Sequence, residues 1–297
     1  MENFDVVTFG SAVVDSFVKA KYAEHGENIL IPYGTKMLIK ELHSEIGGGG
    51  TNTAVAFSRL GFKTGYIGKL GKDLGGNKIL NMLKKEKITF LGGRGSKEET
   101  GSSIILVSRE HYRSILTYKG INNDLHMGEI RPFKTKWMYC SSMVGESLRS
   151  QIKMAKRLKK QGTKIAFNPS EYLIKMGGIR ELLRISDVAI VNKVEAGLLT
   201  KEKDLLKGIS KLGPKIVAIT DGKSKIVVYD GSKEYSIVPP KVKIIEKTGA
   251  GDAFASGFVA GLIAKKSIKE CISLGIRESD AVVKHFGAKN NLLRMRI

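Results

Sequence analysis

The sequence is poor in cysteine and has no apolar run long enough to span a membrane. Its two cysteines, Cys140 and Cys271, form no Cys-x-x-Cys pair, which argues against a disulfide framework and a thiolate metal site. The five histidines show no metal-ligand spacing either. The first residues, Met1–Asp5, lack the basic segment that opens a signal peptide. We therefore expect a soluble cytoplasmic protein with two reduced cysteines in its core.

Acidic residues are few relative to basic ones. The 297 residues include 50 Lys and Arg against 29 Asp and Glu, a formal net charge of +21. Such a charge would suit a nucleic-acid partner. However, the basic residues are spread along the chain, and no aromatic residue interleaves with their dense run Lys153–Lys160. We expect a solvated basic surface that attracts small anionic substrates, and we keep a nucleic-acid-binding protein as the less favoured alternative.

Strand and helix patterns alternate over most of the chain. Hydrophobic residues make up 42% of the sequence, enough for one large α/β domain or two small ones. In the second half, the pattern predicts buried strands at 138–140, 164–167 and 188–191, separated by helices at 147–161 and 178–185. Such repeats predict a parallel sheet with right-handed crossovers, which is the α/β fold class.

Four β-rich runs do not fit this alternation. They lie near residues 13–20, 37–46, 101–108 and 113–118, and the last two form a predicted hairpin around the turn 109–112. Because no helix separates these two runs, they cannot join the parallel sheet through a crossover. We expect a small separate sheet that covers the ligand crevice as a lid.

The stretch Thr248–Phe254, which reads TGAGDAF, carries the strongest chemical signal. The run Lys241–Lys247 before it is β-branched and a buried helix is expected after it, so its glycines are predicted to lie at a strand-to-helix junction. Gly249 and Gly251 would let backbone N–H groups converge on an anion such as phosphate. Asp252 beside that anion suits a base that accepts a hydroxyl proton during phosphoryl transfer.

The glycines of this stretch are also compatible with simpler roles. A glycine-rich junction can serve only for close packing of a strand against a helix. A dinucleotide fingerprint would need glycine where Phe254 stands, and a phosphate loop ending at Gly222-Lys223-Ser224 would need glycine in place of Val217. The sequence therefore favours an anion site of another kind.

Two further stretches predict contacts with a ligand. Four consecutive glycines, Gly47–Gly50, suit a close approach of ligand to backbone, with Asn52 supplying a side-chain amide; a flexible linker is the alternative. Asp15 is expected at the C-terminal end of the first strand, where it could bind hydroxyl groups, or else serve as a turn or cap residue. Asn192 and Glu195 end a later strand and could orient hydrated Mg²⁺ on a nucleotide, or simply form a helix capping box.

Taken together, these motifs resemble those of the ribokinase (PfkB-type) family of carbohydrate and nucleoside kinases. The resemblance rests on Gly47-Gly48-x-x-x-Asn52-x-Ala54, Asn192-x-x-Glu195 and Thr248–Phe254, which follow in that order over nearly the whole chain. It implies a Rossmann-like αβα sandwich with a β-sheet lid, as one domain over 1–297 with lid segments near 12–46 and 98–119. It also implies ATP-dependent transfer of the γ-phosphoryl group to a hydroxymethyl group of a sugar or nucleoside.

The resemblance also implies a role for individual residues. Asp252 would be the catalytic base, and the amides of Gly249, Ala250, Gly251 and Asp252 an anion hole. Asn192 and Glu195 would serve the Mg²⁺ and phosphate region, with Glu195 acting on the metal through water. The remaining contacts would be Thr220, Gly222 and Thr248 on the nucleotide side, and Asp15, Gly48, Gly49 and Asn52 on the acceptor side.

Three departures from the family pattern concern substrate and cation. Ribokinases carry a lysine where this chain has Gly49, and a glutamate where it has only Ser141, Ser142 and Met143, so strict specificity for ribose is not expected. Members activated by a monovalent cation have aspartate where Glu246 stands. A K⁺ ion at Glu246 is therefore a prediction that the sequence leaves open.

The predicted lid also suggests an assembly. Apolar residues such as Ile104, Leu106, Ile115 and Leu116 occur on both of its faces, more than a small sheet with one side in water requires. Lids of this family often pair between subunits, so we expect a homodimer joined through the lids. The alternative is a monomer in which the core domain covers these side chains.

Overall fold

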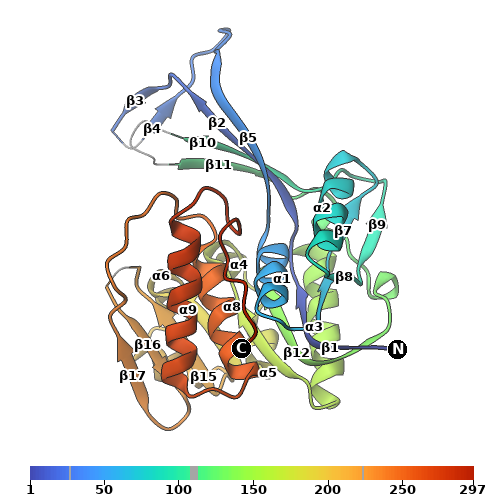
Figure 1. Ribbon diagram of the computed structural model, residues 1–297, viewed down its shortest axis with the longest axis vertical. Coiled ribbons are helices and arrows are strands. Elements are labelled where there is room, and N and C mark those ends of the chain that lie inside the picture. The colour runs from blue at the N-terminus through green and yellow to red at the C-terminus, as the bar shows by residue number, and fades with distance from the viewer. Residues whose placement is uncertain (27, 108–112, 223) are drawn as a thin grey trace.

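A computed structural model describes residues 1–26, 28–107, 113–222 and 224–297. Within these residues a nine-stranded sheet forms the centre of the molecule, in the order β17-β16-β15-β14-β13-β12-β1-β6-β8 (Figure 1). The strands from β8 to β15 run parallel, and β16 and β17 complete one edge as an antiparallel hairpin. Their bounds are β1 (Glu2–Phe9), β6 (Thr64–Ile67), β8 (Thr89–Phe90), β12 (Phe133–Ser141), β13 (Lys164–Asn168), β14 (Val188–Asn192), β15 (Ile216–Thr220), β16 (Ile226–Tyr229) and β17 (Glu234–Ile237).

Helices cover both faces of this sheet and make the sandwich three-layered (Figure 1). Successive side chains of a strand point to opposite faces, so Val7 packs with one helix layer and Val6 with the other. The first layer contains α3 (Gly145–Lys160), α4 (Glu171–Met176), α5 (Arg180–Ile185), α6 (Lys193–Leu199) and α7 (Leu205–Ser210). The second contains α1 (Gly49–Arg59), α2 (Leu74–Lys85), α8 (Ala250–Ile263) and α9 (Ile268–Val283).

A four-stranded sheet of order β11-β10-β2-β5 projects from one end of the sandwich (Figure 1). It confirms that the four unassigned β-rich runs form a separate sheet; the predicted turn 109–112 lies outside the described residues. Its register places Asp15, Phe17 and Ser103 on a buried face, and Ile104, Leu116 and Leu42 on the opposite, outward face. The strands are β2 (Val13–Ala20), β5 (Ile39–Gly47), β10 (Ser102–Val107) and β11 (Arg113–Tyr118).

Shorter elements complete the described chain. Two-stranded ribbons pair β3 (Ala23–His25) with β4 (Asn28–Leu30), and β7 (Lys69–Gly71) with β9 (Gly93–Gly95). Single 3₁₀ turns cover Gly120–Asn123 and Met127–Glu129. No helix among the described residues has the length and apolar character needed to cross a membrane. Both cysteines are free and buried, as expected.

Two local predictions were wrong. The run Lys241–Lys247 forms no strand, so α8 follows a loop and not a strand, and it starts at Ala250. A β-branched run becomes a strand only where it pairs with a neighbouring strand. The N–H groups of Ile245 and Glu246 instead donate to the carbonyl oxygen of Val283 at the end of α9. Asp15 does not end the first strand but lies inside β2, in the small sheet. In addition, the short helix α4 was not predicted.

Candidate active site

The N-terminus of α8 has the geometry that its two glycines suggested. Gly249 is the N-cap residue in the left-handed region, with φ of 80°, and a Cβ there would approach Ala288 to 2.6 Å. Gly251 lies in the first helical turn, and a Cβ on it would meet no atom within 4 Å. Gly249 is thus required for the turn and its packing, whereas Gly251 leaves open space in front of the helix. The first-turn N–H groups and the helix dipole favour an anion in that space.

Asp252 is held by a chain of hydrogen bonds that starts at a buried lysine. The Lys289 ammonium donates to Asn52 Oδ1 at 2.9 Å and also to the Ile46 carbonyl oxygen. Asn52 Nδ2 in turn donates to Asp252 Oδ2 at 2.8 Å. Because a lysine can only donate, it fixes the Asn52 amide with its NH₂ group toward Asp252. The second carboxylate oxygen, Oδ1, lies 3.5 Å from the point where a Cβ on Gly49 would stand.

Burial and charge act in opposite directions on this carboxylate. Burial raises the pKa of Asp252, and the hydrogen bond from Asn52 and the charge of Lys289 both lower it. Burial lowers the pKa of Lys289 to about 8, against the attraction of Asp15, Glu45 and Asp252. Each charge therefore favours the ionised form of the other group, and a carboxylate base has to be ionised to accept a proton.

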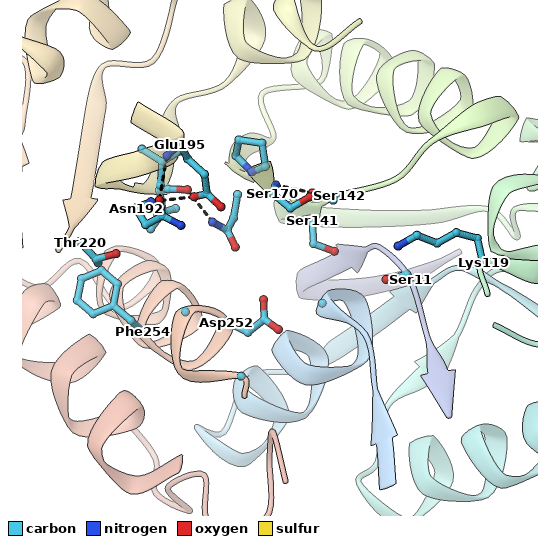
Figure 2. A pocket seen from close by; sticks show the side chains of 17 residues that line it. Ser11, Lys119, Ser141, Ser142, Ser170, Asn192, Glu195, Thr220, Asp252 and Phe254 are labelled. Carbon is cyan, nitrogen blue, oxygen red and sulfur yellow. Dashed lines mark hydrogen bonds between the residues drawn. The ribbon is translucent and has the colours of Figure 1, made fainter. Parts of the chain in front are cut away.

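A cavity of about 380 Å³ opens in front of Asp252 (Figure 2). Ser141, Asn168, Asn192 and Thr220 line it from the carboxyl ends of neighbouring parallel strands, which is where open α/β sheets bind ligands. Gly49, Gly249, Gly251 and Glu195 also belong to its wall. The cavity thus brings predicted residues of all three motifs to one place.

A second cavity of about 460 Å³ shares Asn192, Thr220, Gly251 and Phe254 with the first. Its other walls are mainly apolar and include Ile226, Pro239, Pro240, Val242, Ile244, Ile276 and Val283, together with the predicted residues Gly222 and Ala250. An apolar slot with a few polar groups suits a planar heterocycle. The N-terminus of α8 therefore stands between a polar cavity and an apolar one.

Asn192 and Glu195 form the capping box that was the simpler of their two predicted roles. The Asn192 N–H donates to Glu195 Oε2 at 2.8 Å, and the Glu195 N–H donates to Asn192 Oδ1 at 2.9 Å. Burial raises the pKa of Glu195, while backbone N–H groups of Asn192 and Glu171 lower it. The described residues contain no group of three or more metal-ligating side chains. The cap leaves the carboxylate on the cavity wall, so Glu195 can contact a hydrated cation but cannot enclose one.

The other predicted residues lie behind the cavity wall. Asp15 sits against Gly47, where burial raises its pKa and Ser103 and Lys289 lower it. Gly48 is the N-cap of α1 with φ of 97°, and a Cβ there would come within 2.4 Å of the Ser11 carbonyl oxygen. Thr248 precedes the α8 cap and donates its N–H to Glu246 Oε1 at 3.0 Å. These residues support the site without lining it.

Glu246 is paired with a residue of the small sheet. Its carboxylate is 2% exposed and forms an ion pair with the Arg113 guanidinium, which also donates to Thr248 Oγ1. Arg113 thereby connects β11 to the loop before the anion site. A positive charge of the chain itself stands where the sequence suggested K⁺.

Three cations near the site, Lys289, Arg113 and Lys119, were not predicted from the sequence. Arg113 was placed only in a hairpin strand, and neither Lys289 nor Lys119, which lines the first cavity, was assigned a role. No local motif marks them, because each reaches the site from a segment distant in sequence from its partners.

The chain is similar to several known proteins. A family model described as pfkB family carbohydrate kinase matches residues 3–294. A ribokinase of Haemophilus influenzae is 31% identical over 89% of this chain and 90% of its own length. A cytidine kinase of Thermococcus kodakarensis is 35% identical over 46% of this chain and 52% of its own. The crystal structure of adenosine kinase from Sinorhizobium meliloti, 22% identical, superposes with a TM-score of 0.82 over 96% of this chain and 95% of that one, so the two share a fold.

Proposed function

The chain belongs to the pfkB family of carbohydrate kinases, and on that premise we propose that it transfers the γ-phosphoryl group of ATP to a hydroxymethyl group, with Asp252 as the base. The protein is a kinase of the ribokinase type, which is a phosphotransferase that acts on an alcohol group of a sugar or nucleoside. One observation carries the proposal: Asp252 is oriented by Asn52 at the N-terminus of α8, between the polar and the apolar cavity. The comparisons do not favour the nucleic-acid-binding alternative.

The chemistry follows from the position of Asp252. An acceptor hydroxyl in the first cavity would donate a hydrogen bond to Asp252 Oδ1, since Oδ2 already accepts from Asn52. As the hydroxyl oxygen attacks the γ-phosphorus, its proton passes to Asp252, and the bond to the β-phosphate oxygen breaks to release ADP. The N–H groups of Gly249, Ala250, Gly251 and Asp252 would stabilise the charge that develops on the phosphoryl oxygens.

The second cavity is the proposed nucleotide site. Its apolar walls would hold the adenine, with Thr220 and Gly222 at the strand end, and Asn192 near the phosphates. Glu195 would hold Mg²⁺ through water, and the ion would neutralise phosphate charge when bound. Thr248 would act by holding the loop before α8.

K⁺ activation through Glu246 is the weakest of the predicted roles. The residue keeps one carboxylate oxygen, Oε2, without a partner among the described side chains, but Arg113 already supplies a positive charge. We therefore expect turnover to change little when K⁺ is replaced by tetramethylammonium at constant ionic strength. A large loss of turnover in that exchange would contradict this expectation.

The central experiment is Asp252→Asn. This change keeps the hydrogen bond from Asn52 sterically possible but removes the proton acceptor, so turnover should fall by roughly 10²–10⁴. Affinity for ATP, measured by calorimetry, should be retained. Glu202→Gln, which removes an exposed carboxylate paired with Lys211, is the matched control and should leave turnover unchanged. Near wild-type turnover in Asp252→Asn would rule out the assigned role.

The small sheet is the proposed lid of a single domain, formed from segments 12–46 and 98–119, and the proposed contact of a homodimer. Its outward face exposes Ile104 by 47%, Leu116 by 57% and Leu42 by 62%, whereas Leu106 is buried. A second lid would cover these side chains and the sheet edges. Light scattering should show a dimer of the 32.5 kDa chain, which Leu116→Glu dissociates; a wild-type monomer at micromolar concentration would overturn this assembly.

Closure of the lid would exclude water from the transfer. We expect sugar or nucleoside binding, more than ATP binding, to slow amide hydrogen exchange in β10 and β11. Unchanged exchange on adding an acceptor that turns over would contradict this. A cytoplasmic location remains a prediction, which fractionation of the cells would test.

A further inference from the structure

Two polar groups on the wall of the first cavity have no polar partner among the described residues. The hydroxyl of Ser141, at the end of β12, is buried and forms no hydrogen bond, and the residue is only 4% exposed. The ammonium of Lys119 forms no hydrogen bond or ion pair in the described part of the chain. Its one described interaction is with the Tyr172 ring, 5.6 Å away.

Both groups belong to the acceptor end of the cavity. Figure 2 shows Lys119 at one end, Thr220 at the other, and Asp252 between them. Ser141 Oγ lies 3.1 Å from the point where a Cβ on Gly49 would stand, and Asp252 Oδ1 lies 3.5 Å from the same point. A molecule whose hydroxyl meets Asp252 would therefore reach Ser141, and its far end would face Lys119.

Two neighbouring serines, Ser142 and Ser170, already bond to each other. Ser142 Oγ donates to Ser170 Oγ at 2.9 Å and accepts from the Ser170 N–H at 2.6 Å. Burial lowers the pKa of Lys119, because no carboxylate among the described residues compensates its charge. The Ser141 hydroxyl is fully buried, and a buried polar group without a partner is rare in folded proteins, whereas Lys119 is partly exposed at the cavity wall.

We propose that the acceptor substrate carries an anionic group, a phosphate or a carboxylate, which Lys119 and the Ser141 hydroxyl bind at the end of the cavity remote from the nucleotide. This inference rests on the proposed kinase function and names the class of its substrate. An ammonium and a hydroxyl both donate hydrogen bonds to such an anion, and neither needs a proton from it. The net charge of +21 would favour the approach of the same substrate.

The test compares an anionic ligand with its neutral parent. Protein saturated with Mg²⁺ and a non-hydrolysable ATP analogue, so that the nucleotide site is filled, is titrated with ribose 1-phosphate against ribose, and with gluconate against glucose. At 150 mM salt, at least one anion should bind about 10- to 100-fold more tightly than its parent, the range expected for hydrogen bonds to a charged group. The pair that shows the difference identifies phosphate or carboxylate.

Two variants and a control assign the effect. Lys119→Met should bring the paired affinities to within about threefold of each other, and Ser141→Ala should narrow the gap less, because it removes a neutral donor. Lys153→Met removes an exposed lysine of α3 and should leave the gap unchanged. Thermal unfolding establishes that each variant is folded. If Lys119→Met does not fold, Ser141→Ala alone tests the proposal.

The proposal is overturned if neither anion binds the wild type more tightly than its parent. It is also overturned if Lys119→Met weakens both members of a pair equally, or if Lys153→Met reduces the gap as much. Failure of the kinase function would look different, since the protein would then phosphorylate no acceptor with ATP. Efficient phosphorylation of neutral sugars or nucleosides with no preference for anions would refute the subsite alone.

Discussion

Lys289→Met tests whether the buried ammonium sets the protonation of the base. Lys289 and Asp252 both bond to the Asn52 amide, through contacts of 2.9 and 2.8 Å, which place ammonium and carboxylate within about 8 Å of each other. At an effective dielectric constant of about 20, their attraction is about 2 kcal/mol, or somewhat more than one pKa unit. Loss of the cation should therefore raise the pKa of Asp252, which burial already raises.

The sign of the pH effect follows from the active form of Asp252. The carboxylate is active, so the acid limb of the pH profile of kcat/KM should move to higher pH by about one unit in Lys289→Met. Burial lowers the pKa of Lys289 to about 8, so the two acid limbs are compared below that pH, where the wild type carries the positive charge. At higher pH the two profiles should converge, because loss of the Lys289 charge changes only the pH at which Asp252 ionises.

Other charged groups around Lys289 also affect the acid limb that this experiment measures. Asp15 on β2, Glu45 on β5 and Asp252 on α8 attract its charge, and Arg59 on α1 repels it. Lys269→Met, an exposed position on α9, is the matched control and should keep the wild-type profile. In Lys289→Arg the acid limb should shift less than in Lys289→Met, because arginine keeps the positive charge. A folded Lys289→Met with reduced kcat but the wild-type acid limb would refute the electrostatic role and leave only a structural one.

Two further predictions concern the loop before α8. Gly249→Ala should lower the free energy of unfolding by roughly 1–2 kcal/mol or more, because φ is 80° and the new Cβ would collide with Ala288. Gly251→Ala should keep the stability of the wild type but lower turnover, because its Cβ would fill the anion site. Denaturant unfolding and steady-state kinetics distinguish these two effects, and equal stabilities of the two variants would contradict the prediction. Arg113→Met should lower the free energy of unfolding by about 3–5 kcal/mol, because it leaves the buried Glu246 carboxylate unpaired. Adding Glu246→Gln should restore most of this stability in denaturant unfolding. Additive losses of stability in the double mutant would mean that the two side chains are not coupled.

The sequence by itself determined the local features of the site. The turn at Gly249 and the Asn192–Glu195 capping box depend on residues within a few positions of each other, so their patterns could be recognised without a fold. The alternation of strands and helices likewise predicted the parallel sheet, because periodicity reflects which side chains must be buried. The separate small sheet followed from runs that had no helix between them.

Local pattern failed where the outcome depended on partners. The run Lys241–Lys247 has strand-like residues but pairs with no strand of the described chain, so its propensity had no effect. Asp15 was placed at the end of the first strand, although that strand ends at Phe9 and Asp15 lies in β2, because the exact ends of strands depend on pairing with neighbours.

Only the tertiary structure decided which charges meet at the site. Lys289 contacts Asn52 across 237 positions of sequence, and Arg113 reaches Glu246 from another sheet. In a sequence rich in lysine, the local pattern does not show which lysine will be buried, because burial and ion pairing arise only when distant segments pack together. The same holds for Lys119 and Ser141. Only the folded structure shows that both line the cavity and that neither has a hydrogen-bond partner among the described residues.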